Sequence, residues 1–93
     1  MENLDVIYVS AKWGLEYDWI IKMSRLCKRQ YESIMQIGDD YLYAKDNINN
    51  LNRVDKAITK IANLLRMSSL SKSISITSDQ YRELAIDLLS ISV

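Results

Sequence analysis

Apolar side chains recur every three or four residues along residues 15–37, the most regular stretch of the chain. Trp19, Met23 and Tyr31 are among them, and this spacing places them on one face of an α-helix. Gly38 comes directly afterwards, and glycine is the residue most often found just past a helix C-terminus. The pattern predicts a long amphipathic helix over residues 15–37.

The first residues fit two interpretations. Leu4, Ile7, Tyr8 and Ala11 suit one face of a helix, whereas the cluster formed by residues 6–9 suits a short strand. We favour a helix over residues 2–12, because no neighbouring segment offers an obvious strand partner.

A second clear apolar stripe begins near residue 54 and reaches Ser68 or Leu70. The asparagines of residues 47–52 indicate a loop, so Asn50 or Asn52 is expected to cap this helix. Its apolar face consists of Val54, Ala57, Ile58, Ile61, Ala62 and Leu65.

Agreeing local signals predict that the last helix begins at Thr77. Thr77 and Gln80 have the spacing of a capping box, in which each side chain bonds the backbone amide of the other residue. Ile76 and Tyr81 have the spacing of the apolar pair that often flanks such a cap. Ile74 and Ile76 alternate with polar residues and are expected to enter the core from an extended corner, not from a sheet.

Composition agrees with a helical fold. The 93 residues include no proline and two glycines, whereas an all-β domain needs frequent tight turns. We expect one domain over residues 1–93, folded as an all-α, antiparallel four-helix bundle. The predicted core is Leu15, Trp19, Met23, Tyr31, Ile34, Val54, Ile58, Ile61, Leu65, Ile74, Ile76, Tyr81, Leu84 and Leu88.

The residue inventory disfavours catalysis. The chain has no histidine, a single cysteine (Cys27) and no glycine-rich phosphate loop. We therefore expect a protein that is not an enzyme and has no catalytic residue, no metal site and no cofactor. No apolar run reaches the length of a membrane span and no signal peptide is evident, so a soluble cytoplasmic protein is expected.

Charge is balanced overall but unevenly distributed. Residues 1–52 contain six basic and eight acidic side chains, and residues 53–93 contain six basic and four acidic ones. No acidic residue lies between Asp55 and Asp79. In the long first stripe, basic residues follow Glu16 and Asp18, an order that suits the helix dipole: Lys22, Arg25, Lys28 and Arg29.

Residues 58–75 also invite comparison with a helix-turn-helix. Ala62 occupies the position of the small residue in the first helix, but Arg66 stands where the turn usually has glycine. Lys72 and Ser75 fall where the recognition helix needs apolar anchors, and repair would need two inserted residues. DNA binding therefore stays an alternative, and no nucleic-acid partner is expected from a chain of balanced charge.

Residues 57–91 resemble the enterocin A-type, or class IIa pediocin-like, bacteriocin immunity proteins. The resemblance consists of the "ITKIANLL" stripe, the connector from Lys72 to Thr77, and a capped final helix with Leu84, Leu88 and Ile91. These are small cytoplasmic proteins of Gram-positive bacteria that fold as antiparallel four-helix bundles. The resemblance implies a protein that protects a bacteriocin producer without catalysis. It would bind the toxin-occupied membrane receptor, the sugar transporter of the mannose phosphotransferase type, from the cytoplasmic side.

The candidate binding surface is the acid-free strip of the third helix together with the last helix: Lys60, Arg66, Lys72 and Arg82. Each of these is equally well explained as an ordinary solubilising charge. The competing function is that of a small phage or mobile-element protein that binds and inhibits a host factor.

Overall fold

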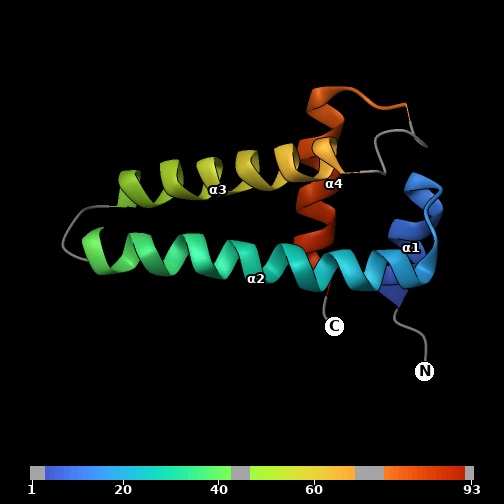
Figure 1. Ribbon diagram of the computed structural model, residues 1–93, viewed down its shortest axis with the longest axis horizontal. Helices are drawn as coiled ribbons and strands as arrows, with labels where there is room; N and C mark the ends of the chain where they lie inside the picture. Colours follow the sequence, from blue (N-terminus) through green and yellow to red (C-terminus); the bar gives the residue numbers. More distant parts are fainter. Residues whose placement is uncertain (1–3, 43–46, 69–74, 92–93) are drawn as a thin grey trace.

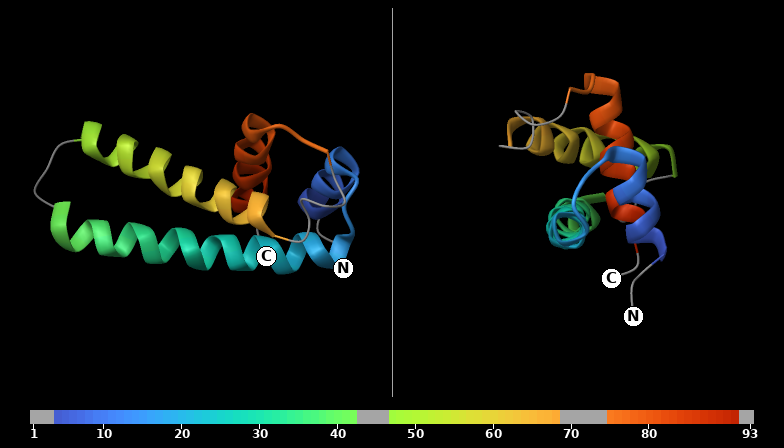
Figure 2. Two further views of the ribbon diagram at one scale, coloured as in Figure 1. Left: turned by 45° about the horizontal axis from the view of Figure 1, so that its top comes forward. Right: turned by 90° about the vertical axis from the view of Figure 1, so that its right-hand side faces the viewer.

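The two longest described helices are α2 (Tyr17–Leu42) and α3 (Asn47–Met67), and the shorter helices pack against this pair. α2 and α3 run in opposite directions as a helical hairpin (Figure 1). Two shorter helices, α1 (Leu4–Trp13) and α4 (Ser78–Ser90), lie beside one another and cross the direction of α2 (Figure 2). The computed structural model describes residues 4–42, 47–68 and 75–91, and these residues contain four helices and no strand.

The predicted all-α fold is confirmed for the described residues, including a helix near the N-terminus. The predicted antiparallel relation holds between α2 and α3, while α4 crosses both long helices instead of lying alongside them. A helix of 13 residues spans only about 20 Å, about half the length of α2. Lying across the hairpin allows this short helix to contact α1, α2 and α3 at once.

A glycine makes the corner between α1 and α2. Gly14 has a φ of +66°, in the left-handed region that favours glycine. The amide of Leu15 donates to the Ser10 carbonyl at 3.2 Å, the bond that closes a Schellman C-cap, and the Leu15 side chain is buried. The Glu16 carbonyl then accepts from the Ile20 amide at 3.0 Å, so α2 begins two residues later than predicted.

The predicted apolar face of α1 is wrong. Val6 and Val9 are buried, while Leu4 is 79% exposed and Tyr8 is 66% exposed. Trp13 packs against the core from the same side as the two valines. The sequence misled because α1 carries apolar residues all round, so periodicity alone does not select the inner face.

The two long helices differ from prediction mainly at their ends. α2 continues through Gly38 to Leu42, and α3 begins at Asn47 instead of Asn50 or Asn52. Asparagine and glycine lower helix stability by about 1 kcal/mol or less per residue, which packing of two paired helices can offset. The signals for a break were therefore too weak to end either helix.

The apolar stripe of α3 is confirmed: Ala57, Ile61, Ala62 and Leu65 are buried and Ile58 packs against them. On α2 the buried line is Ile20, Ser24 and Cys27. The predicted core residues of α2 instead border this line and are half-buried: Trp19, Met23, Tyr31 and Ile34. Val54 is half-buried as well.

The capped corner before α4 is confirmed. The Thr77 hydroxyl accepts from the Gln80 amide at 3.3 Å, and the Gln80 side chain accepts from the Thr77 amide at 2.7 Å. Ile76 packs against the core beside this cap, and Ile74 lies outside the described residues. From here α4 buries the apolar side chains of Tyr81, Leu84, Ala85 and Leu88, followed by Ile91.

Candidate functional site

The single thiol is a core group. Cys27 is 3% exposed, and burial raises its pKa to about 11, because a thiolate would lose its hydration there. A thiol with this pKa stays protonated at neutral pH and is a poor nucleophile. Among residues 4–42, 47–68 and 75–91, no group of three or more His, Cys, Asp or Glu side chains is placed to hold a metal ion.

None of the described helices combines the length and the apolar character needed to cross a bilayer.

Arg82, one of the predicted binding residues, links α4 to α3. Its guanidinium lies 2.7 Å from the Asp55 carboxylate and donates a second bond to the Thr59 hydroxyl. A planar guanidinium suits such a two-pronged contact better than a lysine would. These contacts link α4 to α3, and the Asp55 carboxylate partly neutralises the charge of Arg82.

Lys60 and Arg66 are both exposed on α3. They are six positions apart in the sequence, which places them about 120° apart around the helix. Lys60 lines a groove between α2 and α3, together with Ile34, Leu64 and Met67. Arg66 falls near the Asp55 side of α3. The described residues therefore do not gather these cations into one cluster.

Lys72 lies outside the described residues. Binding by Lys60, Arg66, Lys72 and Arg82 stays a prediction.

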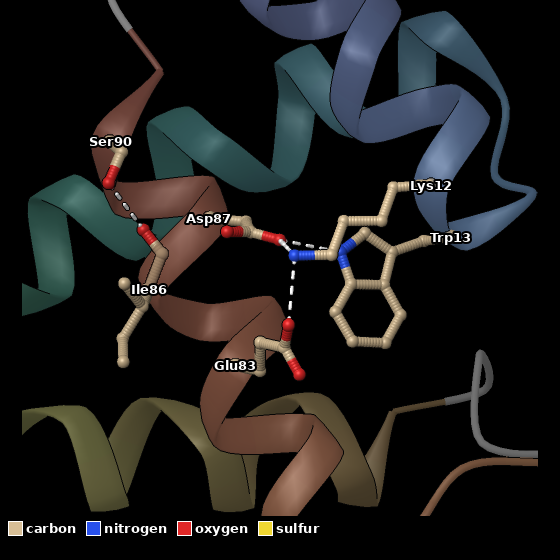
Figure 3. A network of polar contacts seen from close by, with 6 residues as sticks. All are labelled: Lys12, Trp13, Glu83, Ile86, Asp87 and Ser90. Atoms are coloured by element: carbon tan, nitrogen blue, oxygen red, sulfur yellow. Dashed lines mark hydrogen bonds and ion pairs between the residues drawn. The ribbon is translucent and has the colours of Figure 1, made fainter.

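A polar network that the sequence did not predict joins α1 to α4 (Figure 3). One oxygen of Asp87 accepts from the Lys12 ammonium at 2.9 Å and from the Trp13 indole nitrogen at 2.8 Å. Lys12 also lies 2.9 Å from the Glu83 carboxylate. Bonds to Glu83 and Asp87 raise the pKa of Lys12, because both carboxylates favour the ammonium form.

This network holds two helices together and offers no acid–base pair for chemistry. The α1 residues of the network lie more than 70 positions from its α4 residues in the chain, so no local spacing signals the contacts between them. Asp87 and Glu83 are four residues apart on α4, and this shared face is the only trace of the network in the sequence.

An open apolar groove runs where α2, α3 and α4 meet. Its floor consists of half-buried side chains from the three helices, and Ile86 on its edge is 44% exposed. Lys28 and Glu32 stand at the rim. The floor residues are Tyr31, Val54, Ile58 and Leu89. Such a groove suits contact with an apolar side chain of a partner, not chemistry on a substrate.

The solvent side of α2 carries four cations within eight residues, here called the α2 cationic stripe: Lys22, Arg25, Lys28 and Arg29. Helical spacing places Lys22, Arg25 and Arg29 on the side away from buried Ile20, whereas half-buried Lys28 lies nearer Ser24, at the rim of the apolar groove. The sequence suggested only their favourable order along the helix dipole. Asp18 and Glu32 stand at the two ends of the stripe.

Comparison with known proteins leaves the family open. No protein-family model, no curated protein and no solved structure matches the chain.

Proposed function

We propose that this chain is a bacteriocin immunity protein of the enterocin A type, which protects a producer cell in the cytoplasm without catalysis. Its partner would be the toxin-occupied receptor of the mannose phosphotransferase type, bound from the cytoplasmic side. The family's antiparallel four-helix bundle is part of this proposal, and the crossing of α4 over α2 and α3 is the point at which this chain departs from it (Figure 1).

The observation that carries the proposal is the capped corner between α3 and α4. The resemblance rests on an amphipathic helix, a short connector ending in Ile-Thr, and a final helix that opens with Gln80 at its third position. The antiparallel course of α2 and α3 and the buried face of α4 agree with such a scaffold. A protein that works by presenting a surface needs only this scaffold and exposed groups on it.

A helix-turn-helix function is not proposed. That motif joins its helices by a turn of about three or four residues. Here α3 continues as a helix through Arg66, the position of the turn glycine, and residues 75–77 are not helical.

The test is expression of the chain in a sensitive Gram-positive indicator strain that is challenged with a panel of class IIa peptides. We expect survival against at least one peptide. The double variant K60E/R66E should lose protection, whereas K56E, which changes another exposed lysine of α3, should keep it. Unchanged killing by every peptide, with the protein present in the cells, would remove the immunity hypothesis.

A further inference from the structure

The α2 cationic stripe carries charge that the described part of the chain does not neutralise. Lys12 and Arg82 are each bonded to carboxylates of another helix. Across the described residues, by contrast, no ion pair involves a cation of the stripe. Lys22 and Arg29, at its two ends, are about 10 Å apart along the helix axis, so the positive charge is concentrated.

The stripe shares a border with the apolar groove between α2, α3 and α4. Lys28 and Glu32 line the groove, and the same two side chains line the shallow hollow that follows the stripe along α2. Arg25 precedes Lys28 by three positions, which places the two about 60° apart around the helix. Half-buried Ile21 lies between these two directions and lines the same hollow. One surface therefore runs from the apolar floor across Lys28 to Arg25.

The floor of the groove is apolar and open to water. Tyr31, Ile58 and Leu89 are half-buried there, and Ile86 on the edge is 44% exposed. The floor lies where α4 crosses the hairpin, so three helices contribute to it (Figure 1). A hydrophobic groove of this kind suits an amphipathic helix, which lays its apolar side into the groove.

We propose that this surface binds a helical segment of another protein that is apolar along one side and acidic along the adjoining side. Its apolar side chains would lie on the floor of the groove, and its carboxylates would lie beside Lys28 and Arg25. Charge complementarity selects the acidic segment, because these cations have no carboxylate partner among the described residues. Lys22 and Arg29 lie further round α2 and would add attraction during the approach.

Other partners use only part of this surface. Nucleic acid would use the cations but leave the apolar floor exposed to water, and the chain has no net positive charge. A flat lipid surface would reach the cations, but the floor lies between three helices.

A second copy of this chain is a poorer match in charge. Its exposed apolar candidate is the outward face of α1, on which Leu4 and Tyr8 are 79% and 66% exposed. That face is flanked by one acidic and one basic residue, Asp5 and Lys12, so it has no acidic surplus to offer. An acidic amphipathic helix matches both the floor and the cations.

Selection from a display library with the full chain as bait tests the proposal. The library consists of helical peptides of about 18 residues, or five turns, with Leu or Ser on one side and Glu or Lys on the adjoining side. We expect enriched peptides to have Leu at i, i+3 or i+4, and i+7, and to have Glu in excess of Lys. An enriched peptide, labelled for fluorescence polarisation, should bind less tightly as salt is raised.

Two variants test the two halves of the surface. R25E should weaken binding of the labelled peptide about tenfold or more, because it removes one carboxylate contact and adds a repulsive charge. I86S should weaken binding about fivefold or more, through lost apolar contact at the edge of the groove. Both side chains are exposed, so both variants should fold, which circular dichroism checks.

Each variant has a matched control on an exposed position of α3. K56E makes the same loss of positive charge, and L64S removes an apolar side chain that is 54% exposed outside this groove. Both controls should bind the peptide within about twofold of the parent chain. Equal binding by R25E and K56E, or by I86S and L64S, would overturn the proposal.

The selection itself can also contradict the proposal. A library that yields no binder, or binders without an excess of Glu over Lys, would overturn it. Binding to phosphatidylglycerol vesicles or to duplex DNA that R25E abolishes, with no peptide enriched, would assign the cations to lipid or to nucleic acid instead.

The inference goes beyond the proposed immunity function and does not depend on it. The library contains neither toxin nor receptor, so failure here leaves the indicator-strain result standing, and the reverse also holds.

Discussion

The two short helices, α1 and α4, are attached to the same hairpin by different means. α4 presents four buried side chains and Ile91 to the centre of the core and contacts the other three helices. α1 buries two valines, packs Trp13 against the core, and is joined to α4 through Lys12 and Asp87.

The difference teaches that helices of similar length need not contribute similarly to stability. Apolar burial contributes roughly 25 cal/mol for each Å² removed from water, and exposed ion pairs contribute about 0–1 kcal/mol. α4 should therefore dominate the free energy of unfolding, while α1 should open locally at lower cost.

Truncation of a core leucine in α4 gives the largest expected effect. Leu84 is fully buried, and Leu84→Ala should lower the free energy of unfolding by about 2–5 kcal/mol through lost burial and the cavity left behind. Val6→Ala in α1 should cost about 1.5 kcal/mol, since two methyl groups leave the core. Urea unfolding measures both. Equal losses would contradict the ranking of the two helices.

A buried hydroxyl gives the next effect. Ser24 is fully buried and donates to the Leu88 carbonyl at 2.7 Å, in the last turn of α4 where helix carbonyls lack internal partners. Ser24→Ala should lower the free energy of unfolding by about 1–3 kcal/mol, because a buried acceptor loses its bond. Ser90→Ala is the control. That exposed hydroxyl bonds Ile86 within its own helix, and its loss should change stability by less than about 0.5 kcal/mol.

The smallest effect is local to α1. Asp87→Ala removes the acceptor shared by Lys12 and Trp13, and should speed hydrogen exchange of α1 amides about fivefold, equivalent to about 1 kcal/mol. Glu83→Ala removes a more exposed partner of Lys12 alone and should have less effect. Faster exchange across α4 to the same degree would show that the two helices open together.

Elements with strong local signals were predictable. The stripe of α3 and the cap at Thr77 are written in residues three or four positions apart, and both are present as expected. The corner at Gly14 has a local signal too, a glycine before an apolar residue. The cationic candidates on α3 were placed on a helix correctly, but their relation to α2 and α4 was not foreseen.

The rest depended on packing that no local pattern encodes. The inner face of α1 is chosen by α2 and α4, and the inner line of α2 includes a serine because Leu88 supplies its acceptor. The Asp87 network joins residues at opposite ends of the described chain. The direction of α4 also depends on packing, because this short helix crosses α2 and α3 and contacts both of them.

The place of α4 in the order of synthesis has a consequence for the cell. During translation α1, α2 and α3 leave the ribosome before α4. The apolar faces of these helices that α4 covers therefore stay exposed to solvent until residues 78–90 are made. The first three helices can form early and pair loosely. The core is completed only when the fourth arrives, so nascent chains are at greatest risk of aggregation or proteolysis just before that moment.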